Sequence, residues 1–229
     1  MELNADFSKR VSVHAADLPW VPSPTPGVDR RMLDRIGDEV ARATSIVRYA
    51  PNSAFPAHTH GGGEEFLVLD GVFEDESGAF PAGSYVRNPP QSRHTPGSHP
   101  GCTIFVKLWQ FDPSDRAFVR IDTDRLPYQP VVEAPGVSSK TLFERSTETV
   151  RMQRWAPHAR VRWPDIAGGA EVLVLAGDFE ESGERFSRLS WLRLPTGATL
   201  DAIAGSDGAE VWVKTGHLSA VSSVPQERT

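Results

Sequence analysis

The sequence contains very little cysteine. Its 229 residues include one, Cys102, so no disulfide can form within the chain. This excludes the disulfide-rich secreted class and fits a reducing compartment. The surrounding stretch, "GCTIFVKL", is apolar and rich in strand formers. We therefore interpret Cys102 as a buried filler and not as a nucleophile.

Long apolar runs and basic clusters are also missing. The longest apolar runs, "FLVL" and "VLVLA", are too short to span a bilayer, and "MELNADFSKR" lacks the apolar core of a signal peptide. There are 24 Lys and Arg against 30 Asp and Glu, a net charge of −6. Such a chain is a poor candidate for nucleic acid or an anionic membrane. We expect a cytoplasmic protein with neither as a partner.

Glycine and proline, in contrast, are frequent, at 19 residues each. They separate short runs rich in Val, Ile, Phe, Leu and Thr, which is typical of an all-β sandwich or barrel. Helical periodicity is weak: the best candidate, residues 29–41, is short and is interrupted by Gly37. The stretch "LPWVPSPTPG" is too rich in proline for a helix or a central strand, and we expect an extended arm or surface crossover there.

The chain repeats itself. "EEFLVLDGVFEDESGAFPAGSYVRNP" is similar to "AEVLVLAGDFEESGERFSRLSWLRLP", with Gly71 on Gly177 and Arg87 on Arg193 at an offset of 106 residues. Proline and loop residues collect near "DRLPYQPVVEAPG". This predicts two similar β-units in tandem, covering residues 1–125 and 126–229.

The repeat separates structural residues from candidates for chemistry. Residues common to both copies, such as the pairs Arg87/Arg193 and Lys107/Lys214, are best explained by the shared fold. Four polar residues occur in the first copy only. At the same offset they fall on proline or apolar residues: His58 on Pro164, His60 on Ile166, Glu64 on Ala170 and His94 on Leu200.

The spacing of these four residues has a physical logic. Residues two apart in a strand project to the same face, so His58 and His60 project together. Glu64 has the same parity after a glycine turn, whereas Glu65 would point outward. Glu64 is therefore the preferred ligand, with Glu65 as the alternative. The gap to His94 fits a hairpin and a strand that returns across the barrel.

Three imidazoles and one carboxylate suit a transition metal. They leave coordination positions open on a six-coordinate ion, which fits Fe(II), Mn(II), Ni(II), Cu(II) or Zn(II) better than a calcium cage of oxygens. The competing interpretation is a polar turn ahead of an ordinary strand. The simultaneous loss of all four residues in the second copy favours one metal site, in the first unit.

At these residues the sequence resembles the cupin superfamily. Its first motif, G-x5-H-x-H-x3,4-E-x6-G, is matched by "HTHGGGEEFLVLDG" apart from the opening glycine, and "PAG" at 81–83 resembles part of the second. His94 arrives later than in the general pattern, as in the ChrR-type cupin family. The resemblance implies two tandem cupin barrels, also called double-stranded β-helices or jelly rolls. Residues 1–125 would form the metal-binding barrel with an N-terminal arm, and 126–229 a degenerate barrel with a packed interior.

The resemblance leaves two functions open. Members include small oxygenases, which implies an Fe(II)-dependent dioxygenase that cleaves a C–C bond in a small diketone or aryl-ketone or enol substrate. Members also include anti-sigma factors, so the alternative is a metal- or ligand-binding sensor module without the sigma-binding domain. Many cupins are dimeric, which favours a homodimer. No catalytic residue beyond the metal centre is identified. An apolar substrate pocket is expected from these residues: Phe55, Phe66, Val68, Tyr85 and Phe105.

Overall fold

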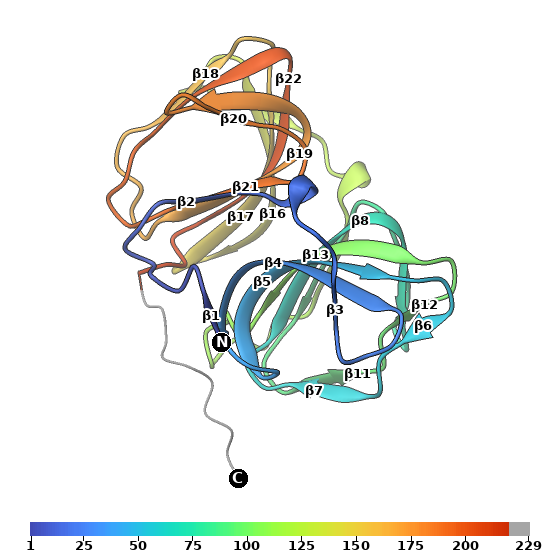
Figure 1. Ribbon diagram of the computed structural model, residues 1–229. Helices are drawn as coiled ribbons and strands as arrows, with labels where there is room; N and C mark the ends of the chain where they lie inside the picture. Colours follow the sequence, from blue (N-terminus) through green and yellow to red (C-terminus); the bar gives the residue numbers. More distant parts are fainter. Residues whose placement is uncertain (220–229) are drawn as a thin grey trace. The chain divides into compact units, whose positions relative to one another are not determined.

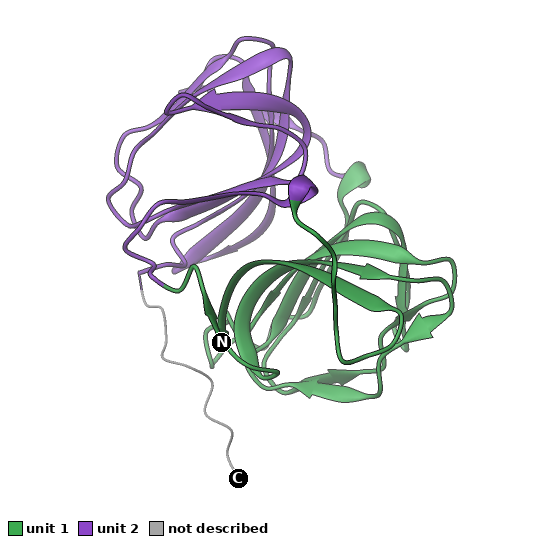
Figure 2. Ribbon diagram, in the orientation of Figure 1, with its two compact units in different colours: residues 1–5, 18–125, 223–229 green, residues 6–17, 126–222 purple. Residues whose placement is uncertain are grey.

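The computed structural model describes residues 1–219, and these form an almost entirely β structure (Figure 1). The chain divides into two compact units (Figure 2). The first comprises Met1–Ala5 and Leu18–Arg125; the second comprises Asp6–Asp17 and the described residues from Leu126 onward. None of the helices in the described range is long and apolar enough to cross a membrane.

Each unit is built from strands joined by short turns. The elements of the first unit are β1 (Glu2–Leu3), β3 (Val21–Pro22), β4 (Val28–Gly37), β5 (Ala41–Tyr49), β6 (Ser53–Ala54), β7 (His58–His60), β8 (Glu64–Asp75), β9 (Gly78–Pro81), β10 (Ser84–Asn88), β11 (Ser92–His94), β12 (Gly97–Ser98), β13 (Cys102–Leu108), β14 (Val119–Asp122) and the 3₁₀ turn η2 (Thr123–Arg125). Those of the second are β2 (Val11–His14), the 3₁₀ turn η1 (Ala15–Asp17), β15 (Gln129–Pro130), β16 (Val137–Arg145), β17 (Glu148–Trp155), β18 (Arg160–Trp163), β19 (Ala170–Glu181), β20 (Glu184–Phe186), β21 (Ser190–Leu194) and β22 (Leu200–Thr215).

The two units have the same strand order. The main sheet of the first runs β1-β4-β5-β13-β8-β10-β14, and that of the second runs β15-β16-β17-β22-β19-β21-β2. The equivalent strands are therefore β4 and β16, β5 and β17, β13 and β22, β8 and β19, and β10 and β21. All of the pairings are antiparallel. The all-β fold expected from the sequence is confirmed.

Alternation along the strands places one face of each sheet in an apolar core. In the first unit, Phe66 on β8 lies between Val86 on β10 and Val106 on β13. These residues belong to a buried cluster: Val28, Tyr49, Phe66, Val68, Phe73, Val86, Cys102, Ile104 and Val106. The second unit has an equivalent cluster, which includes Trp155, Ile166, Val172, Phe179, Leu192, Leu200, Val211 and Val213. Cys102 is 4 % exposed, as expected for a filler.

The N-terminal arm differs from the expected division at residue 125. Residues 6–17 lie in the second unit because β2 forms an antiparallel ladder with β21, from Val11 opposite Arg193 to His14 opposite Ser190. In the first unit the equivalent edge position, beside β10, is taken by β14. The segment ahead of each repeat thus completes the sheet of the other unit.

The glycine shared by both repeats has a steric reason. Gly71 has φ +72° and Gly177 has φ +66°, a conformation that favours glycine. A Cβ on Gly71 would overlap the carbonyl oxygen of Gly101, and a Cβ on Gly177 would overlap that of Gly208. This position inside β8 and β19 therefore needs glycine in both units, whether or not a metal ligand is present.

Candidate metal centre

Two short strands position the three histidines. β7 and β11 form a separate two-stranded ladder in which His58 lies opposite His94 and His60 opposite Ser92. The chain then turns through Gly61–Gly63 into β8, which begins at Glu64. Trp109 packs closely against Gly61 and Gly62, so a Cβ at either glycine would overlap its ring. The glycines therefore allow the backbone of this turn to pack directly against the Trp109 ring.

The three imidazoles converge on one point. The Nε2 atoms of His60 and His94 are 2.8 Å apart, and one ring nitrogen from each of His58, His60 and His94 lies within 4.8 Å of the others. The rings are steeply inclined to one another, at 69° to 78°. His60 and His94 are buried, at 7 % and 5 % exposure, and His58 is half-buried. The structure therefore holds a three-histidine cluster that could bind a metal ion.

Hydrogen bonds determine which ring nitrogen of His58 and of His94 keeps its lone pair for a metal ion. The Nδ1 atom of His58 lies 2.9 Å from the carbonyl oxygen of Pro56, which can only accept, so Nδ1 carries the proton. The Nδ1 atom of His94 lies 3.1 Å from Asp75 Oδ2. In the neutral rings Nε2 is then the lone-pair atom. A carboxylate behind a histidine is the arrangement that orients metal-binding imidazoles.

Glu64 adds the negative charge. Its Oε2 lies 3.4 Å from His60 Nε2 and 3.5 Å from His94 Nε2, and it accepts a hydrogen bond of 2.9 Å from Asn88 Nδ2. Burial would raise the pKa of Glu64, but the imidazoles of His60 and His94 and the Asn88 amide outweigh it and lower the pKa. Glu64 is therefore an anion at neutral pH beside three neutral or cationic rings.

The pKa values of the two buried histidines move in opposite directions. Burial lowers the pKa of His60, and Glu64 offsets this only in part. Burial also acts to lower the pKa of His94, but the hydrogen bond to Asp75 and the charge of Glu64 raise it overall. Burial likewise opposes ionisation of Asp75, yet the bond to His94 lowers the pKa of that carboxyl.

These donors fit a divalent transition metal. Imidazole nitrogens bind such an ion at about 2.0–2.1 Å, so two that meet at a right angle around one ion lie roughly 3 Å apart. The separation of His60 Nε2 and His94 Nε2, 2.8 Å, is close to that value. Two lone pairs at this distance repel unless a proton or a cation lies between them. The nitrogen-rich set is unlike the all-oxygen cages of calcium.

Glu65 lies on the opposite face of β8. Its carboxylate accepts hydrogen bonds from Tyr85 Oη at 2.8 Å and from Arg87 Nη1 at 3.0 Å. Arg87 also pairs with Asp115, at 3.1 Å, and Lys107 lies across the ladder from Glu65. These residues are nearly fully buried, so Glu65 faces away from the histidines but not into solvent. The second unit repeats the buried trio of charges as Glu171, Arg193 and Lys214.

The structure separates the five residues expected to line a substrate pocket. Phe66 and Val68 belong to the core on the histidine face, and Phe55 packs against that core with its ring 5.9 Å from His58. Tyr85 and Phe105 both lie opposite Leu67 and share its face, with Tyr85 bonded to Glu65. Pairing parity puts Tyr85 and Phe105 behind the sheet, so neither can line a pocket at the histidines.

Sequence analysis missed three supporting residues. Asp75 orients His94, Asn88 orients Glu64, and Arg120 donates from Nη2 to Asn88 Oδ1 at 2.6 Å. Asn88 falls on Leu194 in the repeat, so the criterion that selected the histidines would also have found it. Asp75 aligns with another acidic residue, Glu181, so this criterion does not select it. Arg120 comes from β14, whose pairing with β10 only the fold reveals.

No equivalent cluster occurs among the described residues of the second unit. Among residues 1–219, the only group of three or more His, Cys, Asp or Glu that could hold a metal is His58, His60 and His94. Two of the residues that replace ligands, Ile166 and Leu200, are buried in the apolar core at 5 % and 1 % exposure.

Comparison with known families agrees with this geometry. The ChrR cupin-like domain matches the chain twice, over residues 8–112 and 116–219. The chain belongs to the ChrR cupin-like domain family. It is a tandem cupin, as the repeat and the histidine motif suggested. No protein of curated function matches it.

Several solved structures share the cupin fold. A candidate dioxygenase from Nostoc punctiforme has a TM-score of 0.75 at 17 % identity, covering 97 % of this chain and 88 % of its own. The bacterial pirin YhhW from Escherichia coli, in complex with nickel(II), has a TM-score of 0.66 at 14 % identity, covering 90 % and 98 %. Oxalate decarboxylase from Lactobacillus farciminis has a TM-score of 0.62 at 9 % identity, covering 95 % and 88 %. At these identities the likeness concerns the fold.

Proposed function

We propose that this cupin is a mononuclear non-haem Fe(II) dioxygenase that cleaves a C–C bond in a small diketone, aryl-ketone or enol substrate. One divalent metal per chain would be held by His58, His60, His94 and Glu64. The observation that carries the proposal is the convergence of the His60 and His94 Nε2 atoms at 2.8 Å, with the Glu64 carboxylate beside both. Bound there, Fe(II) would supply open positions for substrate oxygen atoms and O₂.

The residues around the cluster favour an uncharged organic molecule as the substrate. The rings of Phe55 and Phe73 lie 5.9 Å from His58 and 6.0 Å from His94, and place apolar surface beside the cluster. Tyr49 packs edge-on against both phenylalanines, and burial raises the pKa of its phenol well above the usual range, so it stays protonated. A phosphorylated substrate would require cationic clamps instead.

Other residues of the chain would keep the site in shape. Asp75 holds the proton on His94 Nδ1, so that the Nε2 lone pair faces the site. Asn88 fixes one oxygen of Glu64, and Arg120 fixes Asn88 in turn. The carboxylate and the imidazoles are thereby held without rearrangement when substrate arrives. The candidate dioxygenase from Nostoc punctiforme shares this fold, which is consistent with the proposed reaction.

The test is oxygen uptake by the reconstituted protein. Metal-free protein is loaded anaerobically with Fe(II), Mn(II), Ni(II), Cu(II) or Zn(II), mixed with small diketones and phenolic ketones, and exposed to O₂. We expect uptake with Fe(II) that is lost in Glu64→Ala and His58→Ala and kept in His99→Ala, an exposed histidine outside the cluster. Zinc in the isolated protein and no uptake with any metal form would favour the sensor module instead.

A further inference from the structure

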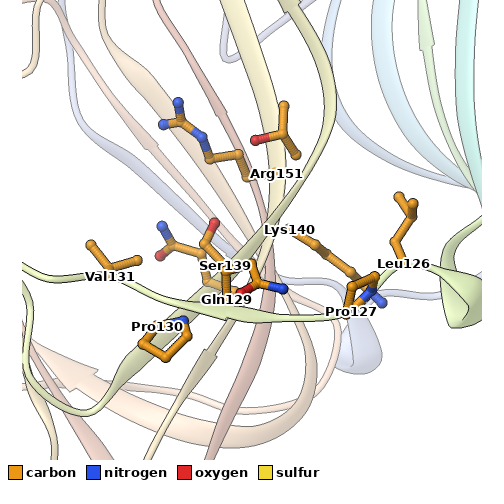
Figure 3. Close-up of a pocket in the computed structure, with 10 residues that line it drawn as sticks. Leu126, Pro127, Gln129, Pro130, Val131, Ser139, Lys140 and Arg151 are labelled. Carbon is orange, nitrogen blue, oxygen red and sulfur yellow. The ribbon is translucent and has the colours of Figure 1, made fainter.

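The interior of the second unit is packed around Ile166, Leu173 and Leu200, as expected, but open space lies beside this core at β17. Two cavities of about 480 and 270 Å³ lie there. They share two lining residues of β17, Arg151 and Gln153, and are therefore neighbours. Figure 3 shows the larger cavity, with Arg151 on one side and Pro130 and Val131 on another.

Arg151 and Gln153 face the barrel interior. In the ladder between β17 and β22, Arg151 lies opposite Val213 and Gln153 opposite Val211, and both valines belong to the apolar core. Side chains of directly opposed residues share a face. An arginine and a glutamine thus project to the side of the sheet where the rest of the unit is apolar.

This polar pair occurs in the second copy only. At the offset of 106 residues, Arg151 falls on Ser45 and Gln153 on Val47 of the first copy. Ser45 and Val47 also face the interior, opposite Val106 and Ile104. The shared fold therefore does not require a cation or an amide at these positions. This is the same pattern that marked the histidines in the first unit.

Both side chains have donors to offer. In the part of the chain that the structure describes, the half-buried Arg151 guanidinium has no hydrogen-bond or ion-pair partner. Gln153 is 9 % exposed, and its Oε1 accepts a hydrogen bond of 3.0 Å from Trp155 Nε1. This bond fixes the amide so that its NH₂ group is the free end, and no acceptor for it occurs within residues 1–219.

The other residues that line the two cavities indicate the charge and polarity of the ligand. The smaller cavity is walled by Trp163, Ile166 and Val213, and an exposed acid, Asp165, lies on its rim. The other nearby cation, Lys140, lies with its ammonium 4.3 Å from the Tyr128 ring, and Figure 3 shows it extending toward Pro127. The site thus offers one planar cation beside apolar walls, and Asp165 disfavours multiply charged anions.

We propose that this cavity binds a small organic monocarboxylate with an apolar or aromatic body. The guanidinium of Arg151 would take the carboxylate with two parallel hydrogen bonds, and the Gln153 amide would add a third. The apolar body would lie against Trp163, Ile166 and Val213. The cavity volumes suit a ligand of this size. The site is separate from the histidine cluster, so it needs no metal.

Calorimetric titration of the intact chain tests the proposal. The probes are acetate, butanoate and benzoate, with benzyl alcohol as a neutral match for benzoate and inorganic phosphate as a compact anion. We expect affinity to rise with apolar size, benzoate to bind, and benzyl alcohol and phosphate to bind at least about tenfold more weakly. Arg151→Gln should weaken benzoate binding roughly 10- to 100-fold. Arg185→Gln, an exposed arginine of the same unit, and His60→Ala should leave it unchanged.

The proposal is overturned if no carboxylate binds, if phosphate binds as well as benzoate, or if Arg151→Gln binds benzoate like the parent chain. Circular dichroism and thermal unfolding check that each variant is folded. Should Arg151→Gln fail to fold, Arg151→Lys and Gln153→Leu make the same test. Each is expected to weaken benzoate about 3- to 10-fold through lost hydrogen bonds. Unchanged binding in both variants would also overturn the proposal.

Discussion

Glu64 and Glu65 are adjacent in the chain, yet their carboxylates lie on opposite faces of β8. Glu64 lies 3.4 Å from His60 Nε2, whereas Glu65 lies 3.0 Å from Arg87 Nη1. Both are buried, at 7 % and 1 % exposure. One strand thus carries the candidate metal site on one side and a buried ion network on the other, and the two can be tested separately.

Removing one cluster histidine should remove the metal without unfolding the chain. His60→Ala and His94→Ala should each reduce bound metal from about one equivalent per chain to below roughly a tenth, because the remaining donors no longer enclose the ion. The fold should persist, since each unit has its own apolar core. Elemental analysis and circular dichroism measure the two effects. His99→Ala should keep its metal, and global unfolding of the metal-free protein would contradict this prediction.

Asp75 should tune metal affinity from behind His94. Asp75→Asn keeps the size of the side chain but weakens the hydrogen bond that holds the proton on His94 Nδ1. We expect metal affinity to fall about 10- to 100-fold, as for other partners of metal-binding histidines. Competition with a chromogenic chelator measures it. Asp70→Asn is the matched control, because Asp70 is an exposed aspartate of the same strand, β8; an equal loss in both variants would contradict the role of Asp75.

Metal retention should weaken as the pH falls. Burial lowers the pKa of His94, but Asp75 and Glu64 raise it overall, so the metal-free site holds a proton at pH values above the usual histidine pKa of about 6.5. Binding must displace this proton. Affinity should therefore start to fall while the pH is still above about 6.5. In Asp75→Asn the fall should begin at lower pH. Zinc titrations at several pH values measure this; a flat profile down to about pH 5 would refute it.

Arg87 should contribute strongly to the stability of the fold, and it takes no part in the candidate metal site. Its side chain is 0 % exposed and bridges Glu65 and Asp115. Arg87→Ala leaves two buried carboxylates without this cation, and we expect the free energy of unfolding to fall by about 3–5 kcal/mol. Denaturant titration measures it, with the exposed Arg93→Ala as control. A change below about 1 kcal/mol would contradict this prediction.

Cys102 should be unreactive while the chain is folded. Burial raises the pKa of its thiol to about 11. A thiol-specific disulfide reagent at neutral pH should react fully only after denaturation. Because the folded pKa lies above the unfolded value of about 8.5, this group's contribution to stability is complete below that pH and is lost as the pH rises toward 11. Rapid labelling of the native protein would contradict the assignment.

The repeated β-unit and the histidine set can be predicted from the amino-acid sequence alone. Period-two spacing predicted that His58, His60 and Glu64 share a face, and the loss of ligands at Ile166 and Leu200 predicted that the second unit has no such cluster. Such inferences can be made from the sequence because they depend on short separations and on comparison between equivalent positions. The weak helical pattern at residues 29–41 became β4 and the start of β5, because pairing within the sheet outweighs local propensity.

The three-dimensional structure was needed to show which distant segments meet. It placed β2 in the second unit and β14 in the first. It put Tyr85 and Phe105 behind the sheet, brought Asp75 and Arg120 to the histidine cluster, and left a cavity at Arg151. The physical reason is that these outcomes depend on strand register and on packing between residues far apart in the chain, which no local pattern encodes.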